Sequence, residues 1–209
     1  MGNTMLAMNT ITIRELLPAE LPGAGALLGR GMRDNPLHVS VVGPDPARRE
    51  VVFGAILGGL LASLHRKGTI LGAHLDGRLV GVCALVPPGH GQPGLAENLA
   101  LVRLVFAQTS LGVTLKALRW LGTWARHEHQ EPHWHLGPVG VERDLQGRGI
   151  GGALLREFCA RVDAQGGVAY LETDKDVNVT FYEKFGFKTE ARADVVGVPN
   201  WFMLRGAVR

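Results

Sequence analysis

Apolar and polar positions follow two different periods along this chain, and together they predict an α/β protein. Alternation from residue to residue predicts strands, and apolar residues spaced three to four positions apart predict helices. In the first half, the predicted elements are a strand at 11–13, helices over 18–30 and 50–66, and strands at 69–74 and 79–86.

Turn residues separate these elements. Asp76-Gly77 lies between two apolar strands and is the clearest hairpin signal in the chain. The stretch 31–49 contains Asp-Asn-Pro and Gly-Pro-Asp-Pro, so we expect a loop there and treat it as a candidate substrate lid. The Pro-Pro-Gly that begins at Pro87 is expected to end the second strand of the hairpin.

The second half alternates helical and strand patterns without an internal repeat. A helical pattern over 95–129 has a break near 110–112, and Trp120 and Trp124 share one face of it. A pair at this spacing is typical of a core stripe, but it also suits the wall of a substrate pocket. The remaining predicted elements are strand 134–141, helix 151–163, strand 168–173, helix 180–185, and strands 188–195 and 201–205.

Composition limits the size and partners of the protein. The 209 residues are 46% hydrophobic, which suits one sizeable core, so we expect a flexible tail at 1–10 and a single domain over 11–209. Lys and Arg number 22 against 19 Asp and Glu. A net charge of +3 does not favour a nucleic-acid partner.

The sequence also predicts a cytoplasmic protein with no membrane partner. Its start lacks the pattern of a signal peptide, and the apolar stretch 51–64 is too short to cross a bilayer core of about 30 Å. Cys83 and Cys159 lie in apolar runs without metal or redox spacing. We expect both to be buried free thiols.

A glycine-rich run between a predicted strand and a predicted helix carries the strongest chemical signal. It contains Gly147, Gly149, Gly151 and Gly152. Glycines allow tight turns that bring backbone N–H groups close to an anion, and the following helix directs its positive end to the same place. The run therefore predicts a phosphate or pyrophosphate site.

Two common phosphate loops fit this run poorly. A Walker loop ends in Gly-Lys-Ser/Thr, and neither the lysine nor the hydroxyl is present here. Gly147, Gly149 and Gly152 formally meet the dinucleotide pattern, and Glu172 could pass for its acidic partner. However, too few residues follow for the remaining strands of a dinucleotide-binding domain.

The run from Gln146 to Gly151 resembles the Gln/Arg-x-x-Gly-x-Gly/Ala motif of the GCN5-related N-acetyltransferase family. Val139-Gly140-Val141 resembles the central strand of that family, and 171–173, Asn178 and 181–187 match its later motifs in order and spacing. Pro-His-Trp-His at 132–135 and Trp-Phe-Met at 201–203 are most similar to the branch that contains puromycin N-acetyltransferase.

The resemblance implies a fold, a donor and a reaction. The fold is a mixed, mostly antiparallel sheet flanked by helices, with splayed central parallel strands and a pyrophosphate-binding loop. The reaction transfers an acetyl group from acetyl-CoA to a primary amine of a small molecule by direct attack in a ternary complex. The residues implied to bind acetyl-CoA are Val139, Gly140, Val141, Gln146, Gly147, Arg148, Gly149, Ile150, Gly151, Gly152, Asn178 and Tyr182.

Several alternatives remain open at this stage. The acceptor could be a protein N-terminus or lysine, the chain could be a non-catalytic acyl-CoA-binding module, and a homodimer is neither required nor excluded. Asn178 would also be explained as a helix N-cap. Gly140 would also be explained as an ordinary strand glycine, rather than as the mark of the splayed irregularity.

An amine with a pKa of about 10.4 must lose a proton before it attacks a thioester. Glu172 is the first candidate base because it ends the strand beside the central one, and His135 or His133 is the second. A purely structural carboxylate remains the alternative for Glu172. Tyr182 matches the family's acid for the leaving thiol, and backbone N–H groups near Gly140 and Val141 are expected to stabilise the oxyanion.

Four histidines crowd into a short segment at His127, His129, His133 and His135. No acidic or cysteine ligand accompanies them at an established zinc spacing. We therefore predict no metal and expect a polar strand entry, with His133 and His135 on one face.

Overall fold

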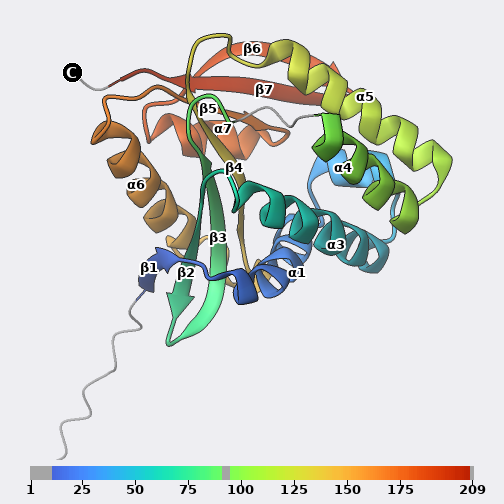
Figure 1. Cartoon of the computed structure of the whole chain (residues 1–209), viewed down its shortest axis with the longest axis horizontal. Helices are drawn as coiled ribbons and strands as arrows, with labels where there is room; N and C mark the ends of the chain where they lie inside the picture. Colours follow the sequence, from blue (N-terminus) through green and yellow to red (C-terminus); the bar gives the residue numbers. More distant parts are fainter. Residues whose placement is uncertain (1–10, 91–94, 208–209) are drawn as a thin grey trace, which may run out of the picture.

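A computed structural model describes residues 11–90 and 95–207 and contains one seven-stranded sheet (Figure 1). The strand order is β1-β2-β3-β4-β5-β7-β6, and every neighbouring pair is antiparallel except β4 and β5. The strands are β1 (Ile11–Glu15), β2 (Thr69–Leu75), β3 (Arg78–Val86), β4 (Trp134–Val141), β5 (Ala169–Thr173), β6 (Lys188–Val195) and β7 (Val198–Arg205).

Helices cover both faces of this sheet (Figure 1). The α-helices are α1 (Leu21–Met32), α2 (Pro36–Val42), α3 (Pro46–Leu64), α4 (Leu95–Gln108), α5 (Leu111–His127), α6 (Ile150–Asp163) and α7 (Asp176–Glu183). Short 3-10 turns lie at Pro18–Glu20 and Arg143–Leu145. The predicted fold class is confirmed, including the mostly antiparallel sheet and its one parallel pair.

The burial of β3 explains why its sequence reads as one apolar run. Cys83 and Leu85 pack in the cluster that contains the α6 side chains, whereas Val82 and Ala84 pack in the cluster of α1 and α3. Successive side chains of a strand point to opposite faces, so a strand covered on both faces is apolar at every position.

Glycines let α1 and α3 cross with their backbones almost in contact. A Cβ added at Gly25 would lie 2.5 Å from the Cα of Gly58, and one at Gly29 would lie 2.7 Å from the nitrogen of Gly54. No larger residue fits at this crossing without moving a helix. The close approach fixes α1 over β3 and β4.

The parallel strands β4 and β5 separate after their first residues. They pair only at Trp134 with Ala169 and at His135 with Tyr170. Opposite β3, the register shifts by one residue between Leu136 and Val139, which places a bulge at Gly137-Pro138. Beyond that point the facing edges of β4 and β5 are unpaired, so their backbone groups are open to a ligand.

The sequence suggested that the irregularity lies at Gly140. The structure places it at Gly137-Pro138 instead. Gly140 is buried, and an added Cβ there would lie 2.6 Å from Cδ2 of Leu28 on α1. Its glycine is explained by the close passage of α1 over β4.

The predicted loop at 31–49 is wrong, whereas the role of this segment as a substrate lid stays a prediction. The segment contains α2 and the start of α3, and Pro36 and Pro46 each occupy a first helical position. Proline is favoured there because its nitrogen carries no hydrogen, and a backbone N–H at the first helical position has no partner within the helix. Asp174 caps α2 from outside the helix, since its Oδ2 accepts a bond of 2.8 Å from the Leu37 amide.

The other predicted elements agree with the structure, with shifted ends. The short helix predicted at 180–185 begins earlier, as α7 at Asp176, and the last strand begins at Val198. The predicted tail at 1–10 lies outside the described residues. Cys83 and Cys159 are buried free thiols, as expected. None of the helices within the described ranges combines the length and apolar character that crossing a bilayer requires.

Candidate active site

The glycine-rich run forms a loop that leads directly into α6. Gly147 has a φ of 76° and Gly149 has a φ of 83°, a region that side chains other than glycine rarely adopt. A Cβ added at either position would meet no atom within 4 Å, so the space above both residues is open. The first bond into α6 runs from the Ala153 amide to the Gly149 carbonyl at 3.0 Å.

The start of α6 therefore offers unpaired backbone donors. The amides of Ile150, Gly151 and Gly152 precede that first bond and have no carbonyl one turn earlier to accept from them. They add to the positive end of the helix dipole, which favours an anion. Ile150 points its side chain into the core, so only its backbone faces the loop. This arrangement fits a diphosphate.

The side chains around the loop serve different purposes. The Gln146 amide donates to the carbonyls of Gly31 at 2.9 Å and Val141 at 3.1 Å, so it fixes the loop between α1 and β4. Arg148 is exposed beside the glycines. Arg143 pairs with Asp34 at 3.1 Å, and Arg161 pairs with Glu15 and Glu157, so Arg161 belongs to the helix surface.

A cavity of about 400 Å³ connects the gap between β4 and β5 with the helical layer. Its wall includes Val139 on β4, Glu172 on β5, and Asn178 and Tyr182 on α7. A shallow hollow of about 900 Å³ along α1 and α3 contains none of the predicted site residues. The smaller cavity is therefore the candidate acceptor site.

Glu172 faces this cavity and is paired with an imidazole. Its side chain is 5% exposed, and its Oε2 lies 3.3 Å from Nε2 of His135. Burial opposes a charge on His135, but the carboxylates of Glu172 and Glu128 more than offset it, so the pKa of His135 lies above its ordinary value. The two candidate bases predicted from the sequence thus form one proton-holding pair.

Tyr182 is buried on the wall of the same cavity. Its ring packs edge to face against Phe187, with centroids 6.0 Å apart. Burial raises the pKa of its hydroxyl, and the nearby Cys83 and Asp174 add to the effect. The hydroxyl therefore stays protonated across the neutral range, as a proton donor must.

Asn178 does not cap α7. It is the third residue of that helix, and its Nδ2 donates to Oγ1 of Thr173 at 3.2 Å. The N-cap alternative is therefore wrong. Asn178 and Thr173 both line the cavity and join the end of β5 to the start of α7.

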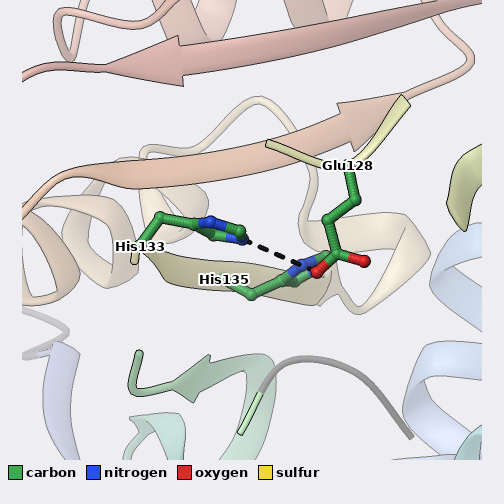
Figure 2. A group of neighbouring side chains, drawn as sticks. All are labelled: Glu128, His133 and His135. Atoms are coloured by element: carbon green, nitrogen blue, oxygen red, sulfur yellow. Dashed lines mark ion pairs between the residues drawn. The ribbon is translucent and has the colours of Figure 1, made fainter. Parts of the chain in front are cut away.

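Besides the pair of His135 and Glu172, the crowded histidines form two further carboxylate contacts. His133 lies 3.7 Å from Glu128 and His129 lies 3.3 Å from Glu190, measured between ring nitrogen and carboxylate oxygen. His133 and His135 point to the same side, toward Glu128, as Figure 2 shows. The shared face expected from the sequence is confirmed.

The group that could hold a metal ion consists of Glu128, His133 and His135. Their ligand atoms all lie within 4.8 Å of one another (Figure 2). In the sequence, Glu128 was set aside as a ligand because the helical pattern over 95–129 places it at a predicted helix end. The structure brings its carboxylate to the histidines, where it pairs with His133, while His135 pairs with Glu172. The absence of a metal stays a prediction.

The profile of the acetyltransferase (GNAT) family matches residues 44–187, which include the glycine loop and most of the cavity wall. The chain belongs to the GNAT family of acetyltransferases. Enzymes of this family take their acetyl group from acetyl-CoA. The matched range includes the glycine loop, β4, β5 and α7.

Solved structures show the same fold at low identity. One, from Corynebacterium glutamicum, is described as histone acetyltransferase HPA2 and related acetyltransferase. It is 21% identical with a TM-score of 0.72, and the match covers 97% of this chain and 98% of that chain. A polyamine N-acetyltransferase from Drosophila melanogaster has 13% identity and a TM-score of 0.62, covering 94% and 100%. A GNAT family acetyltransferase from Brucella melitensis in complex with acetyl-CoA has 20% identity and a TM-score of 0.53, covering 97% and 91%.

The tryptophan pair combines the two roles that the sequence left open for it, whereas Asp174 was missed in the sequence. Trp120 and Trp124 line the cavity as well as packing in the core, and Trp124 donates to Asn200 at 3.0 Å. Asp174 also lines it and holds α2 in place. The sequence signal that could have identified Asp174 is its position directly after an apolar strand.

Proposed function

We propose that this chain transfers an acetyl group from acetyl-CoA to a primary amine of a small molecule by direct attack within a ternary complex. The observation that carries the proposal is the cavity, because Glu172 and Tyr182 both lie on its wall. A base and an acid on one enclosed wall can serve the two proton transfers that the reaction needs. The apolar wall supplied by the helices gives the acceptor a place to bind.

Acetyl-CoA supplies the acetyl group as a thioester when it binds. The open space above Gly147 and Gly149 and the free amides of α6 support a diphosphate site. The unpaired edges of β4 and β5 support a place for the arm that carries the sulfur. The residues we assign to this substrate are Val139, Gly140, Val141, Gln146, Gly147, Arg148, Gly149, Ile150, Gly151, Gly152, Asn178 and Tyr182.

The pair of Glu172 and His135 is our proposed base. A carboxylate in a partly closed cavity attracts the ammonium form of the acceptor, and the pair can then take its proton. Because the two groups are close enough to couple, the proton belongs to the pair rather than to one residue.

Tyr182 is our proposed acid. Its hydroxyl remains protonated because burial raises its pKa, so a proton is available for the departing thiolate. A thiol has an ordinary pKa of about 8.5, and the thiolate needs that proton to leave readily at neutral pH.

We also propose that the chain lies in the branch that contains puromycin N-acetyltransferase, so that a toxic or antibiotic amine is a reasonable acceptor. The support is the Pro-His-Trp-His run at 132–135 and the Trp-Phe-Met run at 201–203. His135 lies on the cavity wall, and the Phe202 ring stacks on His127 with centroids 4.5 Å apart. Of the residues in these two runs, His135 is the one that lines the cavity.

The test is release of free thiol from acetyl-CoA over two panels, one of small primary amines and one of peptides. We expect turnover with small amines and none with peptides that offer a free N-terminus or a lysine. Turnover with peptides alone would support a protein acetyltransferase instead. Binding of acetyl-CoA without turnover in either panel would indicate a non-catalytic module.

A further inference from the structure

The cavity wall has two chemically different parts. The part formed by α2, α3 and α4 is lined by apolar side chains such as Leu37, Val41, Phe53, Ile56 and Val105. Among the described lining residues of these three helices, His38 is the one ionisable group. Burial lowers its pKa to about 3, so its ring is neutral. Trp120 extends this apolar part from α5.

Among the residues that the structure describes, the acidic side chains of the lining lie at the other end. The acidic lining residues are Glu128 at the end of α5, Glu172 on β5 and Asp174 just after β5. No lysine or arginine lines the cavity within the part of the chain that the structure describes. The cavity therefore favours a ligand with a positively charged group, but only where that group lies at the end beside the sheet.

Asp174 contributes little to binding a further cation. Its two oxygens accept from the Leu37 amide at 2.8 Å and from the Asn35 side chain at 3.4 Å, so the carboxylate is already bonded within the protein. Burial also raises its pKa. Glu172, which is paired with His135, remains as the group that attracts the ammonium.

We propose that the acceptor is an amine with a single positive charge and an apolar body, such as an arylalkylamine or a branched or extended alkylamine. The ammonium lies beside Glu172, and the body lies against the apolar wall of α2, α3 and α5. Moving apolar surface out of water favours such a body, and the aromatic rings of Phe53 and Trp120 suit an aromatic one.

The same wall disfavours polyamines and agmatine, which carry a second positive charge away from the reacting amine. That second charge would be buried among apolar side chains without a carboxylate partner, which is costly. The structural likeness to a polyamine N-acetyltransferase and to an agmatine N-acetyltransferase, at 13% and 14% identity, therefore does not extend to the acceptor.

The experiment measures kcat/KM for 2-phenylethylamine, agmatine and spermidine with acetyl-CoA at saturation. We expect 2-phenylethylamine to exceed both multiply charged amines by at least about 100-fold. A series from n-propylamine to n-hexylamine should rise about 3-fold for each added methylene. Equal or better turnover of agmatine or spermidine, or a flat alkylamine series, would overturn the inference.

One variant tests the apolar wall directly. Ile56→Asp places a carboxylate in the apolar part of the cavity, and we expect it to lower the preference for 2-phenylethylamine over agmatine by about 10-fold or more. Ile56→Val is the matched control and should keep the preference. If the aspartate variant does not fold, the alkylamine series on the unaltered enzyme still decides the question.

This inference rests on the proposed function, and the two fail differently. Turnover of agmatine or spermidine at least as fast as 2-phenylethylamine overturns the acceptor class but leaves a small-molecule acetyltransferase. No turnover of any small amine, with turnover of peptides, contradicts the proposed function itself.

Discussion

Nε2 of His135 lies 3.3 Å from Oε2 of Glu172, across the two parallel strands at the point where they begin to separate. His135 and Tyr170 form the last pair between these strands, and Glu172 follows two residues later on β5. The contact therefore places the proposed base at the mouth of the gap. It also gives that base a pKa that depends on two residues.

This contact predicts how the rate depends on pH. The pair can accept a proton from the amine only when it does not already hold one. Because the pKa of His135 is raised, kcat/KM should fall as the pH drops through a value above 6.5, the pKa of free imidazole. His135→Gln should move this acid limb by about 1 unit or more. Glu172→Gln should lower kcat/KM by about 100-fold or more.

The pH profile of kcat/KM for the three proteins is the measurement. Glu190→Gln is the matched control, because Glu190 also pairs with a histidine, His129 at 3.3 Å, but does not line the cavity. Its profile should overlay that of the unaltered enzyme. An acid limb that stays in place in His135→Gln would exclude the imidazole from the base.

Tyr182→Phe should lower kcat more than it weakens the binding of acetyl-CoA. The change removes one hydroxyl from a ring that stays packed against Phe187, so only the proton donor is lost. Loss of general acid catalysis costs about 100-fold in rate. Steady-state kinetics together with calorimetric binding of acetyl-CoA separate the two effects.

Tyr170→Phe is the control, since the sequence has only two tyrosines. Its hydroxyl donates to the His127 carbonyl at 2.9 Å, away from the cavity, so the same deletion should cost about 1 kcal/mol of stability and little rate. Equal rate losses in both variants would argue that Tyr182 has no special role.

A side chain at Gly149 should block acetyl-CoA. Gly149→Trp fills the open space beside the free amides of α6, and we expect binding to weaken by about 100-fold or more, because anion contacts with the helix start would be lost. Calorimetry measures the affinity. Gly166→Trp imposes the same left-handed strain, at a φ of 60° and also in open space, but at the far end of α6. If both variants bind acetyl-CoA normally, the loop does not hold the diphosphate.

The local elements were predictable because local patterns determine them. The strand Trp134–Val141 has the bounds that its pattern predicted, and the glycine run marks the start of α6. The turn at Asp76-Gly77 also lies where expected, with Asp76 itself at a φ of 51°. In each case the residues that set the conformation are neighbours in sequence.

The parts that were not predicted depend on distant residues. The helix α2 is capped by Asp174, 137 positions after Leu37, so its local sequence of proline, asparagine and glycine resembles a loop. The two carboxylates beside His135 are Glu128, directly after α5, and Glu172 on β5. No spacing in the sequence predicts that they lie together. The bulge at Gly137-Pro138 likewise becomes visible only against the register of β3.

Arg205 should stabilise the fold through a bridge that depends on pH. Its guanidinium bonds both oxygens of Asp163, at 2.6 and 2.8 Å, and also the Phe185 carbonyl at 2.8 Å. These bonds to Arg205 lower the pKa of Asp163. Stability from a lowered carboxyl pKa is fully present above the unfolded value of about 3.9 and is lost as the pH falls through the folded value.

Arg205→Met should therefore lower the free energy of unfolding by about 2 kcal/mol at pH 7, with a smaller loss below pH ~4. Urea denaturation at both pH values measures it. Arg14→Met is the comparison, because Arg14 also bonds both oxygens of a carboxylate, Glu20, but at the exposed surface, where such a pair adds little. A loss from Arg205→Met that does not change with pH would assign the effect to packing instead.

The crossing of α1 and α3 predicts opposite effects for the same substitution at two glycines. Gly29→Ala would place a Cβ 2.5 Å from the Glu50 carbonyl oxygen and 2.7 Å from the Gly54 nitrogen, and backbone atoms cannot rotate away. The helices must move apart, at a cost of about 2 kcal/mol. Gly23→Ala meets no atom within 4 Å and removes a flexible residue from α1, so it should stabilise by up to about 1 kcal/mol. Urea denaturation measures both variants, and a Gly29→Ala protein as stable as Gly23→Ala would show that the helices do not approach this closely.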